Sequence, residues 1–188
     1  MATEKTETIN EHYTYDDYIT WDDDVRYELI DGVAYALAAP NTMHQKLSGR
    51  LYLKLDSFMR GKKCDVFYAP YDVRLNYDKG DDTVVQPDLL VVCDKTKIDK
   101  KGCNGAPDLI IEIVSPSDPS RDLFQKYHKY LLAGVREYWI VDPDSKLVTL
   151  CVLDGDRYIT KIYTEEDLIP SSIFDGLSIN LKEIFEEL

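Results

Sequence analysis

Alternating and continuous apolar runs divide much of the chain into predicted strands. Residues 25–37 read VRYELIDGVAYAL, two extended runs around an Asp-Gly pair, which is a strong hairpin signal. Three more extended runs follow at residues 66–75, 84–93 and 107–115. The last two consist mainly of Val, Leu and Ile, so they are predicted to be central strands of a sheet that is covered on both faces.

Helical periodicity marks the segment between the hairpin and these strands. Asn41 or Thr42 is the expected N-cap. Apolar residues then recur every three or four positions, at Met43, Leu47, Leu51, Leu55 and Phe58. This spacing predicts an amphipathic helix, which we expect to end near Gly61.

A second helix is predicted after Pro116, with Ser117 or Asp118 as its N-cap, and it is expected to end at Gly134. The run EYWIVDP at residues 137–143 then predicts another strand. A strand, helix, strand order implies a right-handed crossover between parallel strands. The predicted fold class is therefore α/β, with a mixed central β-sheet flanked by helices.

The C-terminal part predicts a hairpin that turns at Asp154-Gly155, a short strand near Leu177 and a terminal helix, LKEIFEEL. A length of 188 residues suits one domain, so residues 1–188 are expected to form a single domain. Residues 1–24 are expected to be an acidic leader. They lack the basic start and apolar stretch of a secretory signal, and the chain has no run long enough to span a membrane, which predicts a cytoplasmic protein.

The four cysteines stand singly, without a CxxC pair or metal-finger spacing, at Cys64, Cys93, Cys103 and Cys151. Reduced, partly buried thiols are therefore expected. The formal charge of −13 argues against nucleic-acid binding, because phosphate backbones are usually met by basic surfaces. The acids, however, concentrate in residues 1–24 and 154–188, which carry net charges of −7 and −6, and residues 25–153 are neutral.

Basic residues in this neutral middle form one stripe of the first helix. Lys46, Arg50 and Lys54 recur every four residues, so they share a helix face. Two interpretations are open for this stripe. It is either a solvated face, which is the common case, or a ridge that contacts DNA phosphates.

Glu112 is the most informative single residue, because it lies within the apolar run at residues 107–115. A carboxylate in such a place must be protonated, paired with a base or bound to a cation. Asp88 poses the same question in the preceding predicted strand. Two carboxylates about 5 Å apart repel by roughly 3 kcal/mol at an effective dielectric of about 20, which favours a bound cation. Hard oxygen ligands without a histidine cluster indicate Mg²⁺ or Mn²⁺.

Lys126 is the candidate cationic partner, since it lies on the helix that follows the Glu112 strand. Each residue also has a structural interpretation. Asp88 could be a turn residue at the start of a strand, Lys126 an ordinary surface lysine, and Glu112 a partner of Arg136 or Lys126. Glu28, on the hairpin, is a weaker metal-ligand candidate.

Glu28 could also simply pair with Arg26 or Arg50. His44, at the start of the first helix, is a further candidate, and its structural alternative is a core histidine with satisfied hydrogen bonds.

Taken together, these segments resemble the Uma-type restriction endonuclease family of the PD-(D/E)xK nuclease superfamily. The resemblance runs from about Tyr15 to the terminal helix. It is carried by YELIDG at 27–32, His44, QPDLLVV at 86–92, PDLIIEIVSPS at 107–117, the lysine of DLFQKYHKY and GVREYWIVDP at 134–143.

The resemblance implies that Asp88 is the aspartate of the first motif and Glu112 the acid of the second. In the parent superfamily the lysine lies two residues after that acid, but Val114 occupies this position here. The resemblance then implies that Lys126 approaches from the following helix instead, and that Glu28 is similar to the extra acid that an N-terminal element supplies.

The predicted function is hydrolysis of DNA phosphodiester bonds with Asp88, Glu112 and Lys126 as catalytic residues. Asp88 and Glu112, with Glu28 as a weaker third ligand, would hold Mg²⁺ or Mn²⁺, which lowers the pKa of the attacking water. The alternative is an inactive nuclease-fold scaffold or binding protein, which the overall acidity favours. A small-molecule metallohydrolase is a third interpretation. A homodimer is also expected, since two strands need two cuts and two-fold dimers are the commonest oligomers.

Overall fold

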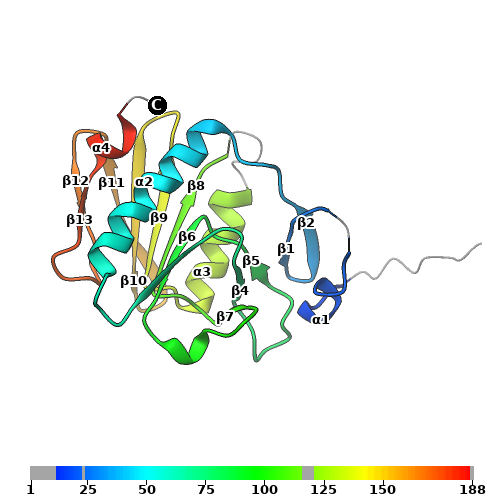
Figure 1. Cartoon of the computed structure of the whole chain (residues 1–188). Coiled ribbons are helices and arrows are strands. Elements are labelled where there is room, and N and C mark those ends of the chain that lie inside the picture. The colour runs from blue at the N-terminus through cyan, green and yellow to red at the C-terminus, as the bar shows by residue number, and fades with distance from the viewer. Residues whose placement is uncertain (1–11, 23, 116–120, 187–188) are drawn as a thin grey trace, which may run out of the picture.

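The computed structural model describes residues 12–22, 24–115 and 121–186, and of residues 121–123 only the backbone. A six-stranded sheet in the order β11-β10-β9-β8-β6-β3 forms its centre (Figure 1). These strands span β3 Asp65–Tyr68, β6 Leu89–Val92, β8 Leu109–Ile113, β9 Glu137–Asp142, β10 Leu147–Asp154 and β11 Arg157–Thr164. Strands β8 and β9 are parallel and the other pairs antiparallel, so the predicted mixed sheet and crossover are confirmed.

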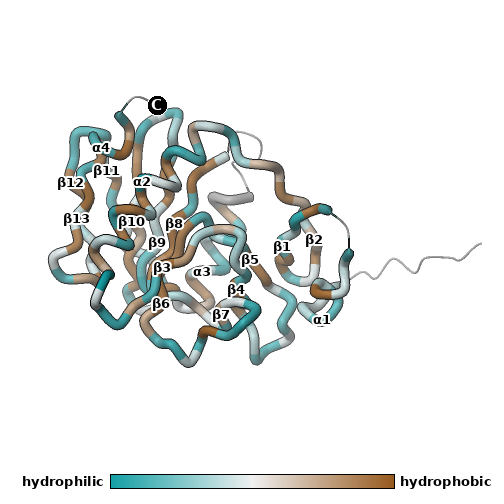
Figure 2. The backbone as a smooth tube through the Cα atoms, viewed as in Figure 1, coloured by the Kyte–Doolittle hydropathy of each residue, from teal (hydrophilic) through white to brown (hydrophobic). Residues whose placement is uncertain are grey.

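Helices cover both faces of this sheet (Figure 1). On one face, helix α2 (Thr42–Met59) and the short α4 (Leu181–Phe185) pack with Leu89, Ile111 and their neighbours in one apolar core. On the other face, η2 (Arg121–Lys126) leads into α3 (Tyr127–Ala133), which packs with Leu90, Ile110 and their neighbours in a second core. Successive residues of β6 and β8 thus enter different cores, which explains why these strands are hydrophobic at every position except Glu112 (Figure 2).

A second sheet lies beside the first, in the order β2-β1-β5-β4-β7. Its strands span β1 Tyr27–Ile30, β2 Val33–Ala36, β4 Asp72–Arg74, β5 Val84–Val85 and β7 Gly102–Asn104. The smaller elements are α1 Tyr15–Tyr18, η1 Lys95–Lys97, β12 Leu168–Pro170 and β13 Ser178–Asn180. Neither β7 nor α1 was predicted from the sequence, because both are too short to show a periodic pattern.

The predictions of two continuous strands were wrong, because each of these runs divides into two strands that belong to different sheets. The run at residues 66–75 divides into β3 and β4 around a cis Ala69-Pro70 bond, and the run at 84–93 divides into β5 and β6 around Gln86-Pro87-Asp88. Proline cannot donate a ladder hydrogen bond, so it is disfavoured inside a central strand. Asp88 consequently lies just before β6, where the chain passes from one sheet to the other.

The turns and caps are mostly as predicted. Asp31 and Gly32, with φ values of 51° and 75°, close the first hairpin in the left-handed geometry that such turns require. The Asn41 side chain caps α2 by accepting a hydrogen bond from the His44 amide, and Gly134, at φ 86°, ends α3. The second predicted helix differs at its start, because η2 is a π-helix; its predicted caps, Ser117 and Asp118, and Pro116 lie outside the described residues.

The prediction of reduced cysteines was wrong for two of the four. Asp65 pairs with Val92 in register, so Cys64 and Cys93 face each other one step beyond the ladder, and they form a disulfide with a Cα–Cα distance of 4.0 Å. Single cysteines 29 positions apart give no sign of this pairing, which depends on strand register. Disulfides are typical of oxidising compartments, so the cytoplasmic location stays a prediction.

Cys103 and Cys151 are free and buried, as expected. Among the described residues, no helix combines the length and the apolar character that crossing a bilayer requires.

Candidate active site

Asp88 lies opposite Glu112 across the β6–β8 pair, because Leu89 is in register with Ile111. Its Oδ2 accepts a hydrogen bond from the amide of Ile113 at 2.7 Å and lies 3.0 Å from Nε2 of His44. The two donors fix the orientation of the carboxylate. Since both contact Oδ2, Oδ1 is left without a hydrogen bond from the described residues.

His44 reaches Asp88 from the first turn of α2, where the Asn41 cap holds its backbone amide. A histidine nitrogen that bonds a carboxylate carries a hydrogen, so Nε2 is the donor of this pair. Nδ1 is buried and has no hydrogen-bond partner in the described part of the chain. His44 is therefore not the fully satisfied core histidine of the structural alternative.

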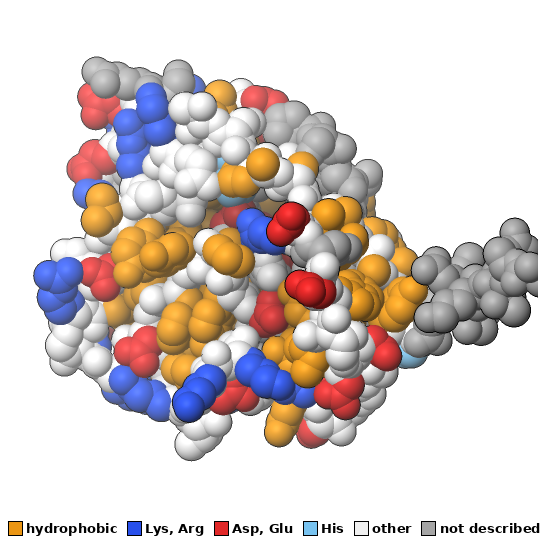
Figure 3. All heavy atoms as spheres, turned by 45° about the vertical axis from the view of Figure 1, so that its right-hand side comes forward, with side chains coloured by type: hydrophobic (Ala, Val, Ile, Leu, Met, Phe, Trp, Pro, Cys, Tyr) orange, Lys and Arg blue, Asp and Glu red, His pale blue; other side chains and the backbone are white. Residues whose placement is uncertain are grey.

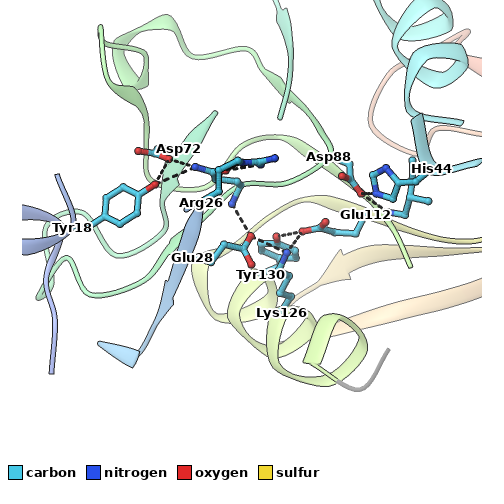
Figure 4. Close-up of polar contacts among 11 residues, drawn as sticks. Tyr18, Arg26, Glu28, His44, Asp72, Asp88, Glu112, Lys126 and Tyr130 are labelled. Atoms are coloured by element: carbon cyan, nitrogen blue, oxygen red, sulfur yellow. Dashed lines mark hydrogen bonds and ion pairs between the residues drawn. The ribbon is translucent and has the colours of Figure 1, made fainter. Parts of the chain in front are cut away.

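Glu112, Lys126 and Glu28 form a second, deeper group (Figure 4). Lys126 Nζ lies 3.0 Å from Glu112 Oε1 and 2.9 Å from Glu28 Oε1, and the Tyr130 hydroxyl donates to Glu112 Oε1 at 2.6 Å. Lys126 is only 4% exposed, Glu112 5% and Glu28 fully buried. Burial, together with the charge of Glu112, raises the pKa of Tyr130 well above its ordinary value, so its hydroxyl stays a donor.

One cleft, with a volume of about 230 Å³, is lined by the side chains of both groups: His44 and Asp88, and Glu28, Glu112 and Lys126. It contains three carboxylates, of Glu28, Asp88 and Glu112, but only two cations, Arg26 and Lys126. Glu28 Oε1 also accepts from the amide of Gln86 at 2.8 Å, whereas its Oε2 is buried without a partner in the described residues. The carboxylates of the cleft thus outnumber its Lys and Arg side chains by one, and one carboxylate oxygen has no hydrogen bond among the described residues, a composition that suits a cation.

A polar chain continues from the cleft into the small sheet (Figure 4). Arg26 donates through Nε and Nη2 to Gln86 Oε1 at 3.0 and 2.6 Å, and Gln86 Nε2 donates to Asp72 Oδ1 at 2.9 Å. Tyr18 donates to the same oxygen of Asp72 at 3.1 Å. Burial raises the pKa of Asp72, while its donors and the charge of Arg26 oppose that rise.

The structure brings five of the predicted site residues into this cleft: Glu28, His44, Asp88, Glu112 and Lys126. Glu28 bonds Lys126, so its pairing with Arg26 or Arg50 was wrong. The surface interpretation of Lys126 was also wrong, because this lysine is buried.

The basic stripe of α2 lies elsewhere, since its residues do not line the cleft. Arg50 Nη1 donates to the carbonyl of Ile184 at 2.8 Å and Lys54 pairs with Glu183, so both are engaged with α4. Lys46 has a partner as well. Their contact with DNA stays a prediction, and these bonds do not favour it.

Sequence reasoning missed several residues of the site. Arg26 and Gln86 stand within or beside the quoted motifs, so motif position was an available signal. Tyr130 gave none, because an aromatic residue on an apolar helix face is ordinary core. Tyr18 and Asp72 gave none either, since they meet Gln86 only through long-range folding.

Two carboxylates of this cleft offer the ligand chemistry that a divalent ion requires. Asp88 and Glu112 supply hard oxygen atoms from neighbouring strands, and Mg²⁺ commonly binds one or two protein carboxylates, with water and phosphate completing its shell. No group of three or more His, Cys, Asp or Glu side chains in the described residues is arranged to hold a metal ion. Glu28 as a third ligand therefore stays a prediction.

Known proteins resemble this chain in sequence and in fold. The chain is 25% identical over 182 residues to an uncharacterised protein, slr1290, of Synechocystis sp., which covers 92% of this chain and 91% of the relative. The crystal structure of a protein from Anabaena variabilis described as "a putative nuclease belonging to DUF820" superposes with a TM-score of 0.75, covering 92% of this chain and 97% of that one. At 20% identity, this likeness establishes the fold. Residues 15–182 match the Uma2 family model, described as "Putative restriction endonuclease", and the chain belongs to this family.

Proposed function

We propose that this protein is a magnesium-dependent nuclease that hydrolyses phosphodiester bonds of DNA. The observation that carries the proposal is the convergence of Asp88, Glu112 and the buried Lys126 in one cleft, from three different elements. Family membership supports a nuclease of the restriction endonuclease type. The metal requirement and the DNA substrate are part of what we propose.

Asp88 and Glu112 would hold the ion. When bound, magnesium polarises the phosphate and lowers the pKa of the attacking water. Asp88 is prepared for this role because His44 and the Ile113 amide hold its Oδ2 and leave Oδ1 for the ion. Mn²⁺ is expected to substitute, since it prefers the same oxygen ligands.

Lys126 keeps a positive charge beside the reacting group. Its amine lies between Glu112 and Glu28, which hold it in place through two ion pairs. Such a cation stabilises the negative charge that develops on the phosphate during hydrolysis. Tyr130 also positions Glu112, because its hydroxyl donates to the same oxygen, Oε1.

One observation favours a second candidate, an inactive scaffold or binding protein with the nuclease fold. Lys126 already neutralises part of the charge of Glu112 and Glu28, and the described residues contain no three-residue metal cluster. A cleft stabilised by its own lysine needs no ion in order to fold. The formal charge of −13 also disfavours a nucleic-acid partner.

Titration of Mn²⁺ into the purified protein by calorimetry separates these candidates. The matched variants are Glu112→Gln, which removes a proposed ligand, and Glu137→Gln, which changes a buried carboxylate outside the cleft. A nuclease site predicts saturable binding in the unmodified protein and in Glu137→Gln, but not in Glu112→Gln. Equally weak heats in all three proteins would support the inactive scaffold.

A further inference from the structure

An exposed aromatic ring stands beside Asp88 at the cleft. Tyr68, the last residue of β3, lines the cleft and is 57% exposed. It is in register with Leu89, and the next amide, of Ala69, donates to the carbonyl of Asp88 at 3.1 Å. The backbone carrying Tyr68 is thus bonded directly to the backbone carrying the proposed metal ligand.

The Tyr68 ring is supported by a neighbour. Tyr52 of α2 contacts it nearly at right angles, with ring centroids 4.9 Å apart and an interplanar angle of 76°. Edge contacts of this kind stabilise an aromatic pair and restrict its movement. The ring is therefore held in place while much of its surface stays open to solvent.

Arg26 supplies a positive charge in the same cleft. Both of its side-chain hydrogen bonds among the described residues go to the neutral amide oxygen of Gln86, and it takes part in none of the ion pairs found among those residues. A guanidinium held by a neutral acceptor keeps its charge available for an anion. Arginine is also well suited to phosphate, because its planar group offers several donors at once.

The surroundings do not suit a long duplex. Duplex binding depends on many contacts between basic side chains and phosphates. Arg50 and Lys54 are instead engaged with α4. On the face shown in Figure 3, Lys and Arg side chains lie in separate groups among Asp and Glu. The cleft volume of about 230 Å³ is also below the range of about 300–1,000 Å³ that is usual for ligand pockets. The small volume of the cleft and the scattered positive charge around it both limit the ligand to a small number of nucleotides.

We propose that this cleft recognises an unpaired nucleotide of single-stranded DNA, with its base stacked on Tyr68 and its phosphate bound by Arg26. Stacking on an aromatic ring requires a base outside the duplex and adds affinity without further positive charge. This inference rests on the proposed nuclease function and adds the substrate class: single strands, flaps or frayed ends rather than continuous duplex.

Fluorescence anisotropy with a labelled oligodeoxyadenylate tests the proposal in the full chain. The measurements use an Asp88→Asn background and a chelator, so that no cleavage can occur. We expect the single strand to bind more tightly than a hairpin duplex of the same length. Tyr68→Ala and Tyr68→Leu should each weaken single-strand binding by roughly five- to hundredfold, whereas Tyr68→Phe should stay within about twofold.

Tyr77→Ala is the matched control, since Tyr77 is 49% exposed but does not line the cleft. It should leave binding unchanged, and melting temperatures should show that all variants fold. Equal binding of single strand and duplex, tighter duplex binding, no binding of either, or no effect of Tyr68→Ala would each overturn the proposal. Binding that depends on Tyr68 together with a failed Mn²⁺ titration would instead reject the nuclease and retain the single-strand site.

Discussion

The two ends of the β6–β8 strand pair carry similar residues but differ in chemistry. At one end, Asp88 follows a proline just before β6, and Glu112 lies opposite in β8. At the other end, Asp108 follows a proline and leads into β8, and the buried Glu137 starts the neighbouring strand β9. In sequence the two ends look similar: each has a Pro-Asp step and a glutamate, Glu112 within an apolar run and Glu137 at the start of one.

At the second end, neutral donors and one exposed arginine bond the two acids. Glu137 accepts from the indole of Trp139 at 2.8 Å and from the amide of Ser172 at 2.6 Å. Asp108 accepts from the Cys93 amide at 2.8 Å and from Arg136, which is 54% exposed. Both acids are therefore structural, since their bonds join neighbouring segments of the chain.

The first end differs in having a cleft, a buried lysine and an oxygen of Glu28 without a hydrogen bond among the described residues. A buried carboxylate by itself thus does not identify a site. Two features distinguish the site: a buried carboxylate oxygen without a hydrogen-bond partner among the described residues, and a cleft that opens to solvent. Both depend on how the second sheet approaches the first.

The largest expected difference between the two ends is in cleavage of DNA with magnesium. Asp88→Asn and Glu112→Gln should each lower the rate by at least about a thousandfold, because each removes a ligand of an ion that supplies several kcal/mol of stabilisation. Asp108→Asn and Glu137→Gln should stay within about threefold of the unmodified rate. Cleavage rates of the four variants on single-stranded and duplex DNA measure this difference. Equal losses of rate in the variants of both ends would contradict it.

A second difference is expected in stability. Lys126→Met should lower the free energy of unfolding by about 3–5 kcal/mol, because it leaves Glu112 and Glu28 buried without their cation. Arg136→Met, its counterpart at the other end, should cost about 0–1 kcal/mol, since that ion pair is exposed. Denaturant unfolding measures both values.

Adding Glu28→Gln to Lys126→Met should restore part of the lost stability, because one uncompensated charge is then removed. A small effect of Lys126→Met, similar to that of Arg136→Met, would contradict the account of a buried ionic group at the first end.

The smallest expected effect is a pH dependence at Glu137. Burial raises its pKa above the ordinary 4.5, so the folded chain keeps this proton at pH values where the unfolded chain has lost it. Stability from the protonated form is therefore present at low pH and lost as pH rises through the folded-state pKa. The stability of the unmodified protein relative to Glu137→Gln should fall over this range, as unfolding at a series of pH values would show. A difference that does not change with pH would contradict the raised pKa.

Much of the site could be predicted because its acids stand out in apolar surroundings. Glu112 is unusual in its strand whatever lies around it, and the resemblance to a known family added the roles of Asp88 and Lys126. Tyr68 could not be identified in this way, since a tyrosine at a strand end is ordinary, and Arg26 had only its position beside a motif to mark it. Their importance comes from elements far apart in sequence that line one cleft.

The sequence by itself determined the elements that depend on local physics. The left-handed turn at Asp31-Gly32, the Asn41 cap, the glycine at the end of α3 and the parallel crossover all follow from backbone preferences and apolar periodicity. Tertiary structure decided where β3 and β6 leave the central sheet, which cysteines pair, and which two of the three buried glutamates contact a lysine. These outcomes depend on register and on contacts between distant segments, and no local pattern in the chain specifies such contacts.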